Sequence, residues 1–306
     1  MIYEYALQPE LVAGLMNRVD FRFLMNLFEE NEPVYFAVYP KLNRWTHLVK
    51  NNFTKTGKIE DTYLTEFIKF IKTRAIKRIE SDYDMKLGWL ENAEFEHNRC
   101  PFDLILAESN PNAKSFVIAH LTQLSNNPNP RLKIPHDRIV NRIASDMANA
   151  VAPMLRLCRK LILVDPHFDP CYDRWRNTLV AFIKAMQRNR CCQELTTVKY
   201  LCKVNARSAS QFATDCDYFL HGSIPSGITL EVTRLAERLT GLELHNRCIL
   251  TDLGGVSFEH GLDESPRTGA QDKVTRMSHD SYKKIWDQYV NNIAFNTHEN
   301  PVVISG

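Results

Sequence analysis

From Leu161 onward, short apolar runs alternate with segments that have the periodicity of helices. Residues 161–164 form an all-apolar run of strand length, and residues 174–190 place their large apolar side chains on one helical face. A strand over residues 196–204, a helix over residues 208–220 and a strand over residues 228–232 follow. This alternation predicts an α/β fold, in which helices cover the faces of a sheet. Ligands in such sheets bind at the carboxyl ends of the strands.

The segment before this alternation contains the strongest linker signal of the chain. Residues 125–135 read SNNPNPRLKIP, with three Pro and three Asn among eleven residues. We therefore predict an N-terminal domain over residues 1–128, either α/β or mostly helical, and a C-terminal domain over residues 136–306. The apolar spacing of residues 136–160 predicts one long helix at the start of the second domain.

The composition limits the classes of protein to consider. A chain of 306 residues with 44% hydrophobic and 24% charged residues is typical of globular domains. It contains no apolar run near the length of a transmembrane segment, about 18 residues, and its N-terminus does not resemble a signal peptide. We therefore expect a cytoplasmic protein without a transmembrane segment. Its eight Cys include no CxxC pair, which argues against a zinc knuckle. The net charge of +2 does not by itself indicate a nucleic-acid partner, although a local basic face remains possible.

Residues 242–264 contain most of the ionisable side chains that suggest chemistry. The apolar alternation and the Gly254-Gly255 pair predict a hairpin, in which His245 and Arg247 share one face of a strand. Asp252, an odd number of residues further on, faces away or lies in the turn. A histidine beside a guanidinium suits a phosphate group, which the histidine can attack and the arginine can neutralise. Alternatively, His245 is an ordinary strand histidine and Arg247 is an ion-pair partner.

The spacing of these residues resembles a known signature. His245-x-Arg247-x4-Asp252 is similar to the HxKx4D motif of the phospholipase D superfamily, with Arg in place of Lys. The order of elements over residues 147–264 also resembles half of that fold, a mixed sheet flanked by helices. The resemblance implies that His245 is the nucleophile, that Arg247 binds phosphate and that Asp252 is structural. It implies no metal and no cofactor.

The chain departs from this family after the turn. The family continues with a GSxN element, whereas this chain reads Glu259-His260-Gly261-Leu262-Asp263. In this respect it is similar to the phospholipase-D-like domains at the C-terminus of MIT-domain proteins, which are regarded as binding modules without catalysis.

Catalysis in the family uses two histidines, and the chain contains no second complete motif. The partner of His245 would be His97, His167, His260 or His245 of the partner subunit, and the last alternative predicts a homodimer. His97 opens a tetrapeptide, His-Asn-Arg-Cys, that is identical to residues 245–248.

A second candidate site follows the apolar run at residues 161–164. Asp165, His167 and Asp169 are interleaved with two Pro, so these side chains either bind substrate or a metal or simply form a turn. His260 and Asp263 are further candidates for substrate binding. Only two metal ligands are visible there, which argues against a metal site.

Two functions follow as hypotheses. The resemblance implies a phospholipase-D-like phosphodiesterase, nuclease-like and part of a bacterial defence or mobile-element system. The departures favour a catalytically inactive module that binds nucleic acid, phospholipid or a protein partner. A subunit of a multi-protein complex is a third possibility.

Overall fold

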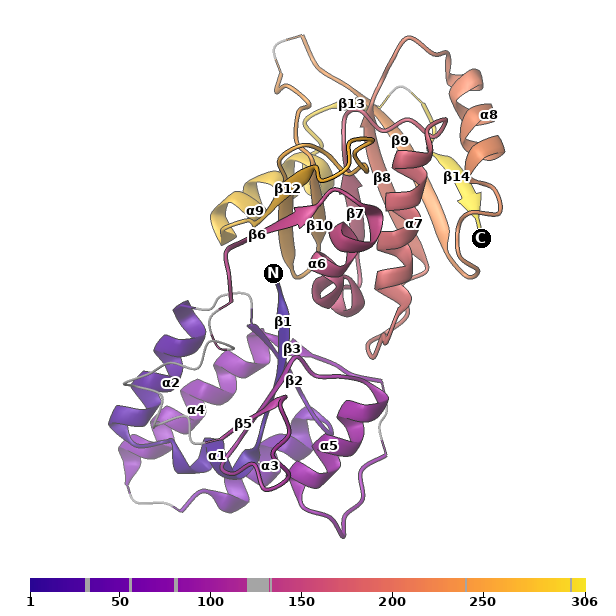
Figure 1. The fold of residues 1–306 in the computed structure, drawn as a ribbon. Coiled ribbons are helices and arrows are strands. Elements are labelled where there is room, and N and C mark those ends of the chain that lie inside the picture. The colour runs from indigo at the N-terminus through magenta and orange to yellow at the C-terminus, as the bar shows by residue number, and fades with distance from the viewer. Residues whose placement is uncertain are drawn as a thin grey trace. The chain divides into compact units, whose positions relative to one another are not determined.

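The fold is described from a computed structural model (Figure 1). It describes residues 1–30, 34–54, 57–79, 82–119, 132, 134–239, 241–297 and 299–306. The chain divides into two compact units. The N-terminal unit consists of Ile2–Ile134 and Cys191–Gln193, and the C-terminal unit of Met1, Pro135–Arg190 and Glu194–Gly306. Most of the predicted linker, including the predicted domain end at residue 128, lies outside the described residues.

The N-terminal unit is built on a five-stranded parallel sheet with the strand order β3-β2-β1-β4-β5. Its strands are short: β1 (Tyr3–Leu7), β2 (Val34–Ala37), β3 (Ala75–Ile76), β4 (Leu104–Ala107) and β5 (Val117–Ala119). Five helices connect them: α1 (Pro9–Gly14), α2 (Arg18–Glu30), α3 (Leu42–Asn52), α4 (Lys58–Thr73) and α5 (Trp89–Arg99). The N-terminal unit is therefore α/β, which decides between the two predicted classes.

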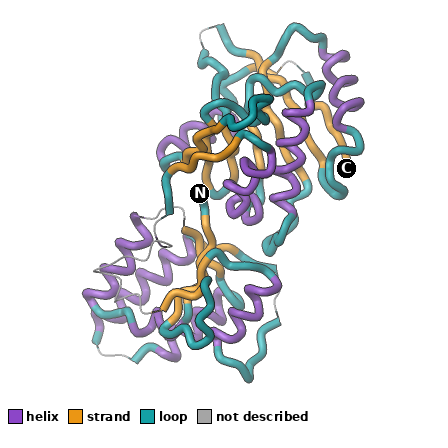
Figure 2. Tube along the Cα trace, viewed as in Figure 1, coloured by secondary structure: helices purple, strands orange, loops and turns teal. Residues whose placement is uncertain are grey.

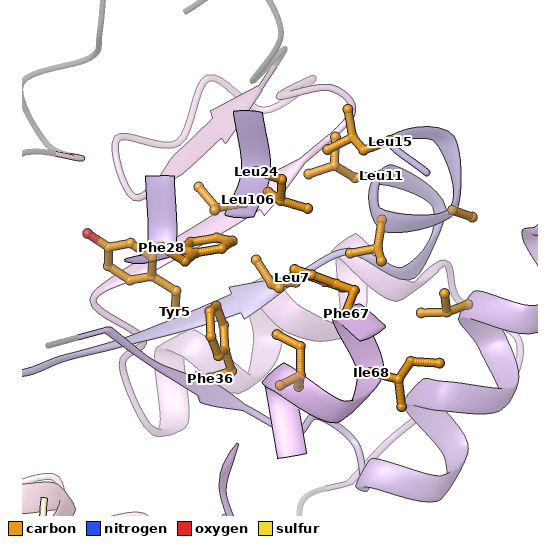
Figure 3. Close-up of a cluster of buried hydrophobic side chains, with 14 of the residues drawn as sticks. Tyr5, Leu7, Leu11, Leu15, Leu24, Phe28, Phe36, Phe67, Ile68 and Leu106 are labelled. Carbon is orange, nitrogen blue, oxygen red and sulfur yellow. The ribbon is translucent and has the colours of Figure 1, made fainter. Parts of the chain in front are cut away.

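Helices cover both faces of this sheet. Adjacent residues of a strand point to opposite faces, so each strand packs against helices on both sides. Tyr5 and Leu7 pack in a cluster with side chains from α1 to α4, whereas Ala6 packs with Trp89 and Ala93 of α5. Figure 3 shows the first cluster, in which Phe28 lies edge-on to Phe36 with ring centroids 4.8 Å apart.

A buried ion network joins three elements of the N-terminal unit. The Arg78 guanidinium, two residues after β3, donates to both carboxylate oxygens of Glu4 at 3.0 and 2.6 Å. It also donates to Glu96 of α5 at 3.0 Å and lies 3.7 Å from the centroid of the Phe102 ring. Such a network is costly to break, because removing one partner leaves buried charges unpaired.

The C-terminal unit contains a mixed nine-stranded sheet, with the path β13-β9-β8-β7-β10-β11-β12-β6 and with β14 also paired to β9. The parallel strands are β7 (Leu161–Val164), β8 (Thr197–Lys203) and β9 (Thr229–Ala236). The antiparallel strands are β6 (Asp137–Asn141), β10 (Cys248–Thr251), β11 (Gly254–Phe258), β12 (Gln271–Arg276), β13 (Asn296–Thr297) and β14 (Val302–Ser305).

Helices flank this sheet as well (Figure 2). They are α6 (Ala144–Leu157), α7 (Asp173–Gln187), α8 (Ala209–Leu220), α9 (His279–Trp286) and the π-helix η3 (Asp287–Asn291). On one side of the sheet, Phe182 of α7 packs edge-on against Phe258 of β11. On the other side, Tyr289 of η3 packs in a cluster with Ile162 and Leu250. The predicted alternation of strands and helices after Leu161 is confirmed, and so is the α/β class.

The predicted helix over residues 136–160 is wrong in its first third. Asp137–Asn141 forms β6, which pairs with β12, and the helix begins only at Ala144. The β-branched side chains of Ile139 and Val140 favour an extended backbone, and pairing with an exposed sheet edge outweighs helical spacing.

Within the described residues, no helix combines the length and the apolar character that a membrane crossing requires. Six cysteines form no disulfide, and five of these are buried. Cys100 and Cys191, both in the N-terminal unit, are paired as a disulfide with Cα atoms 6.0 Å apart.

Candidate functional site

The site lies at the carboxyl edge of the parallel strands of the C-terminal unit. Asp165 follows the last residue of β7, and Lys203 ends the neighbouring strand β8. Strand β10 runs antiparallel to β7 with Cys248 opposite Val164, so Arg247 comes to the same edge as Asp165. This arrangement is the one in which α/β sheets bind ligands.

Strands β10 and β11 form the predicted hairpin, but His245 and Arg247 lie just before β10 rather than on it. Strand β10 begins at Cys248, although the Arg247 carbonyl still accepts a hydrogen bond from Phe258 N at 2.9 Å. Leu244 N donates to the Glu237 carboxylate at 2.8 Å, after the end of β9. His245 therefore belongs to the connection between β9 and β10. The alternation of side chains along a strand does not determine which way it faces.

The two motif side chains differ in their surroundings. His245 is exposed, and its Nδ1 lies 3.1 Å from the Glu243 carbonyl oxygen, so Nδ1 carries the proton and Nε2 is unprotonated in the neutral ring. Arg247 is half-buried, and its Nε–H is buried without a hydrogen-bond partner. In the part of the chain that the structure describes, the Arg247 guanidinium has no salt bridge.

Asp165 is fully buried beneath this edge. Its two oxygens accept hydrogen bonds from His167 N at 2.9 Å and from Leu262 N at 2.8 Å. Burial raises the pKa of this carboxyl to about 6, against the opposing effects of these hydrogen bonds and of the Arg247 charge. Asp165 therefore organises the turn and the 261–263 loop and is too enclosed to contact a large substrate directly.

Gly261 allows this loop to approach the two carboxylates. Its φ is +144°, and an added Cβ would lie 2.7 Å from Asp263 Oδ1, 3.2 Å from Asp165 Oδ2 and 3.7 Å from Arg247 Cδ. Only glycine provides both this backbone conformation and this space.

Asp263 is an ion-pair partner rather than a free carboxylate. It accepts a hydrogen bond from Arg142 Nη2 at 2.6 Å and lies 3.4 Å from Arg174 Nε. Its side chain is almost fully buried, whereas that of Arg174 is 47% exposed. The predicted role of Asp263 in substrate binding would thus act through Arg174, which Asp263 holds at the surface.

His167 lies in the same electrostatic environment as Arg247. Burial, the Arg247 charge and the Lys203 charge lower its pKa, and Asp263 partly opposes them. The imidazole is therefore neutral at pH 7 and can accept or donate one hydrogen bond. Lys203 itself pairs with Glu237 at 2.7 Å.

Asp252 lies at the opposite end of the hairpin. It occupies the β10–β11 turn, and Thr251 before it pairs with Leu161, the first residue of β7. Asp252 Oδ1 accepts hydrogen bonds from Arg159 N at 2.6 Å and Lys160 N at 3.0 Å. These contacts tie the β10–β11 turn to the residues before β7 and separate Asp252 from Arg247.

Two other predicted histidines have partners of their own. His97 belongs to the N-terminal unit, where its ring stacks on Phe116 with centroids 3.6 Å apart and its Nδ1 accepts from Phe102 N at 3.2 Å. His260 Nδ1 lies 3.2 Å from the buried carboxylate of Asp272.

Within the described residues, one group of three potential metal ligands has its ligand atoms within 4.8 Å of one another: Glu259, His260 and Asp272. Asp272 Oδ1 already accepts hydrogen bonds from Glu259 N at 3.0 Å and Lys273 N at 2.7 Å. The Asp272 carboxylate therefore holds the backbone of residues 259–260 against β12.

Sequence reasoning missed several residues of the site, namely Arg142, Arg174, Lys203 and Gly261. Lys203 could have been found, because it ends the strand after β7 and parallel strands share a carboxyl edge. The two arginines contact Asp263 from elements far away in the sequence, and no local pattern indicates such contacts.

Comparisons with known proteins do not identify the chain. No family model matches it, and no curated protein matches it. Among solved structures, it is similar to TrmBL2, described as an archaeal chromatin protein with a novel mode of DNA binding. The identity is 11%, the match covers 83% of this chain and 82% of that one, and the TM-score is 0.27. A TM-score this low does not establish a shared fold.

Proposed function

We propose that the C-terminal unit is a phospholipase-D-like module that binds the phosphodiester backbone of nucleic acid through Arg247. The observation that carries the proposal is the state of this side chain. Arg247 is half-buried at the carboxyl edge of the parallel strands, and among the described residues its guanidinium has no hydrogen-bond or salt-bridge partner. A guanidinium that the protein leaves unpaired suits bidentate binding of a phosphate.

The surrounding side chains favour a nucleic acid over an isolated phosphate. Tyr172 is 55% exposed, and the Arg174 guanidinium lies 5.6 Å from the centroid of its ring. An exposed aromatic ring beside cations is the combination on which unpaired bases stack while their backbone is neutralised. Single-stranded nucleic acid is therefore the preferred ligand class.

Binding without hydrolysis is favoured because the described residues of the C-terminal unit contain no second histidine motif beside His245. Of the candidates within one chain, His97 is engaged in the core of the other unit and His260 faces Asp272. His167 remains at the edge near Arg247, where it would contribute a neutral hydrogen-bonding group.

A phosphodiesterase is the second candidate, and one observation favours it. The Nδ1 contact with Glu243 leaves Nε2 of His245 unprotonated and exposed, as a nucleophilic imidazole requires. Hydrolysis would then use two copies of the chain, with one motif histidine attacking phosphorus and the other protonating the leaving oxygen. This candidate implies a homodimer.

Fluorescence anisotropy with a labelled 20-nucleotide single strand tests the proposal. Arg247→Ala should weaken binding about 10- to 100-fold, because a hydrogen bond between charged groups is lost. Arg188→Ala is the matched control, since Arg188 is exposed at the C-terminal end of α7 and should have little effect. Equal affinities of all three proteins would contradict the proposal.

Gel analysis of the same strand after incubation with EDTA separates the two candidates. An intact strand supports the binding module. Cleavage that persists in EDTA and is lost in His245→Ala supports the phosphodiesterase.

A further inference from the structure

The N-terminal unit has a topology that places a ligand site at a known position. In its parallel sheet, β2 lies on one side of β1 and β4 on the other. Where strand order reverses in this way, the connections leave a crevice outside the carboxyl ends of the two central strands. Here Glu108 N, directly after β4, donates to the Gln8 side chain after β1 at 2.7 Å.

A pocket of about 490 Å³ occupies this crevice. Glu10 and Gly14 contribute to it from α1, Glu108 from the end of β4, and Asn52, Phe53 and Glu60 from the region of α3 and α4. The volume falls within the range of small-molecule sites, about 300–1,000 Å³. The pocket belongs wholly to the N-terminal unit and shares no residue with the site around Arg247.

The described charged side chains that line this pocket are all negative. Among the described residues, its lining includes three carboxylates, from Glu10, Glu60 and Glu108, and no Lys, Arg or His. None of the three forms a salt bridge within the described residues. Fixed negative charge of this kind repels phosphate and carboxylate ligands, so the nucleotide that such a topology would suggest does not fit.

Glu10 provides an independent indication of a missing partner. Its Oε1 accepts a hydrogen bond from Asn52 Nδ2 at 3.3 Å, whereas its Oε2 is buried and has no hydrogen-bond partner. A buried carboxylate oxygen without a donor is costly, typically about 1–3 kcal/mol. A ligand that donates hydrogen bonds would remove this cost.

The spacing of the carboxylates decides between a metal ion and a larger cation. Elsewhere in the described residues, three ligand atoms converge within 4.8 Å at Glu259, His260 and Asp272, but the three pocket glutamates do not converge in this way. They cannot share one metal ion. They can each contact a different part of an extended molecule, and Phe53 adds an aromatic ring to the lining.

We propose that this pocket binds a small organic cation whose ammonium or guanidinium groups are separated by an apolar chain. Aliphatic polyamines and guanidinoalkylamines have this chemistry. The charged ends pair with the glutamates, the N–H groups satisfy Glu10 Oε2, and the methylene chain lies along Phe53.

Isothermal titration calorimetry of the full chain tests this inference with agmatine and spermidine as probes, and with AMP and Mg²⁺ as the competing ligand classes. We expect saturable binding of at least one of the two amines and none of AMP or Mg²⁺. Glu108→Gln should weaken amine binding about tenfold or more, because one charged hydrogen bond is lost. Glu60→Gln provides a second variant should Glu108→Gln fail to fold.

Glu66→Gln is the matched control, since Glu66 is exposed on α4 and does not line the pocket. Unchanged affinity in this control supports a defined site. The inference is overturned if neither amine binds, if AMP or Mg²⁺ binds instead at this pocket, or if Glu66→Gln weakens binding as much as the pocket variants.

Discussion

The buried carboxyl of Asp165 makes the stability of the chain depend on pH in a defined direction. Its pKa is raised from 3.8 to about 6 in the folded chain. Between these two values the folded chain binds more protons than the unfolded chain, so the free energy of unfolding rises as the pH falls from 6 to 4. A difference of about two pH units corresponds to about 3 kcal/mol. This amount is absent above pH 6, where folding has to bury the charged form.

Asp165→Asn removes this titration and leaves a side chain of similar shape. The variant loses one acceptor for the backbone N–H of His167 or Leu262, and this loss alone contributes a destabilisation of about 1–3 kcal/mol that does not depend on pH. Urea unfolding at several values between pH 4 and 7 gives the unfolding free energy of each protein. The difference between the two proteins should change with pH. His167, whose pKa is lowered, contributes with the opposite sign in both proteins and cancels.

Asp169→Asn is the matched control for this experiment. Burial alone would raise the pKa of Asp169. Hydrogen bonds from Arg207 and Cys171 outweigh this effect and hold the pKa below 3.8. Its stabilising contribution is lost only as the pH falls below about 4, so this control should give a constant difference between pH 4 and 7. If Asp165→Asn also gave a constant difference over that window, the reasoning about burial at the sheet edge would be refuted.

Three further substitutions test other parts of the structure by urea unfolding. Gly261→Ala should destabilise by about 1–3 kcal/mol, since φ is +144° and the new methyl would meet the Asp263 carboxylate; an unchanged midpoint would contradict the packing of that loop. Asp252→Ala should cost about 1–3 kcal/mol through two orphaned backbone N–H groups and leave oligonucleotide affinity unchanged; a selective loss of affinity would instead indicate a part in the site. Arg78→Met should cost about 3–5 kcal/mol because two buried carboxylates lose their counter-charge, and a smaller effect than that of Asp252→Ala would show that the network is hydrated.

The order of elements in the C-terminal unit could be predicted from the sequence because each element is marked by its own periodicity. The all-apolar run at Leu161–Val164 is typical of a strand buried on both faces. Ligands of α/β sheets bind at the carboxyl ends of the strands, so Asp165, directly after this run, is expected at the site. The predicted helix over residues 208–220 is also present, and the Ser208 hydroxyl caps it by accepting a hydrogen bond from Gln211 N at 3.2 Å.

The parts that could not be predicted depend on contacts between distant segments. Strand β6 resembles a helix in its apolar spacing and becomes a strand only because β12 offers a partner edge. Arg142 and Asp263 are 121 residues apart, so no local sequence pattern predicts their ion pair. The sequence does not decide between an α/β and a mostly helical N-terminal unit, because some strands of its sheet have only two or three residues and are too short to show a period.

The central claim, that Arg247 binds a phosphodiester at the carboxyl edge of the sheet, is tested most directly by observing this side chain. Its Nε–H is shielded from solvent and has no partner within the described chain, so its exchange with water should be slow and its NMR signal observable. We would titrate a short thymidine oligonucleotide into protein with ¹⁵N-labelled arginine and assign the signal with Arg247→Lys. The account predicts that the Arg247 Nε–H signal shifts and saturates at the concentration that anisotropy gives for binding. An Arg247 signal that stays unchanged while the oligonucleotide binds would contradict it.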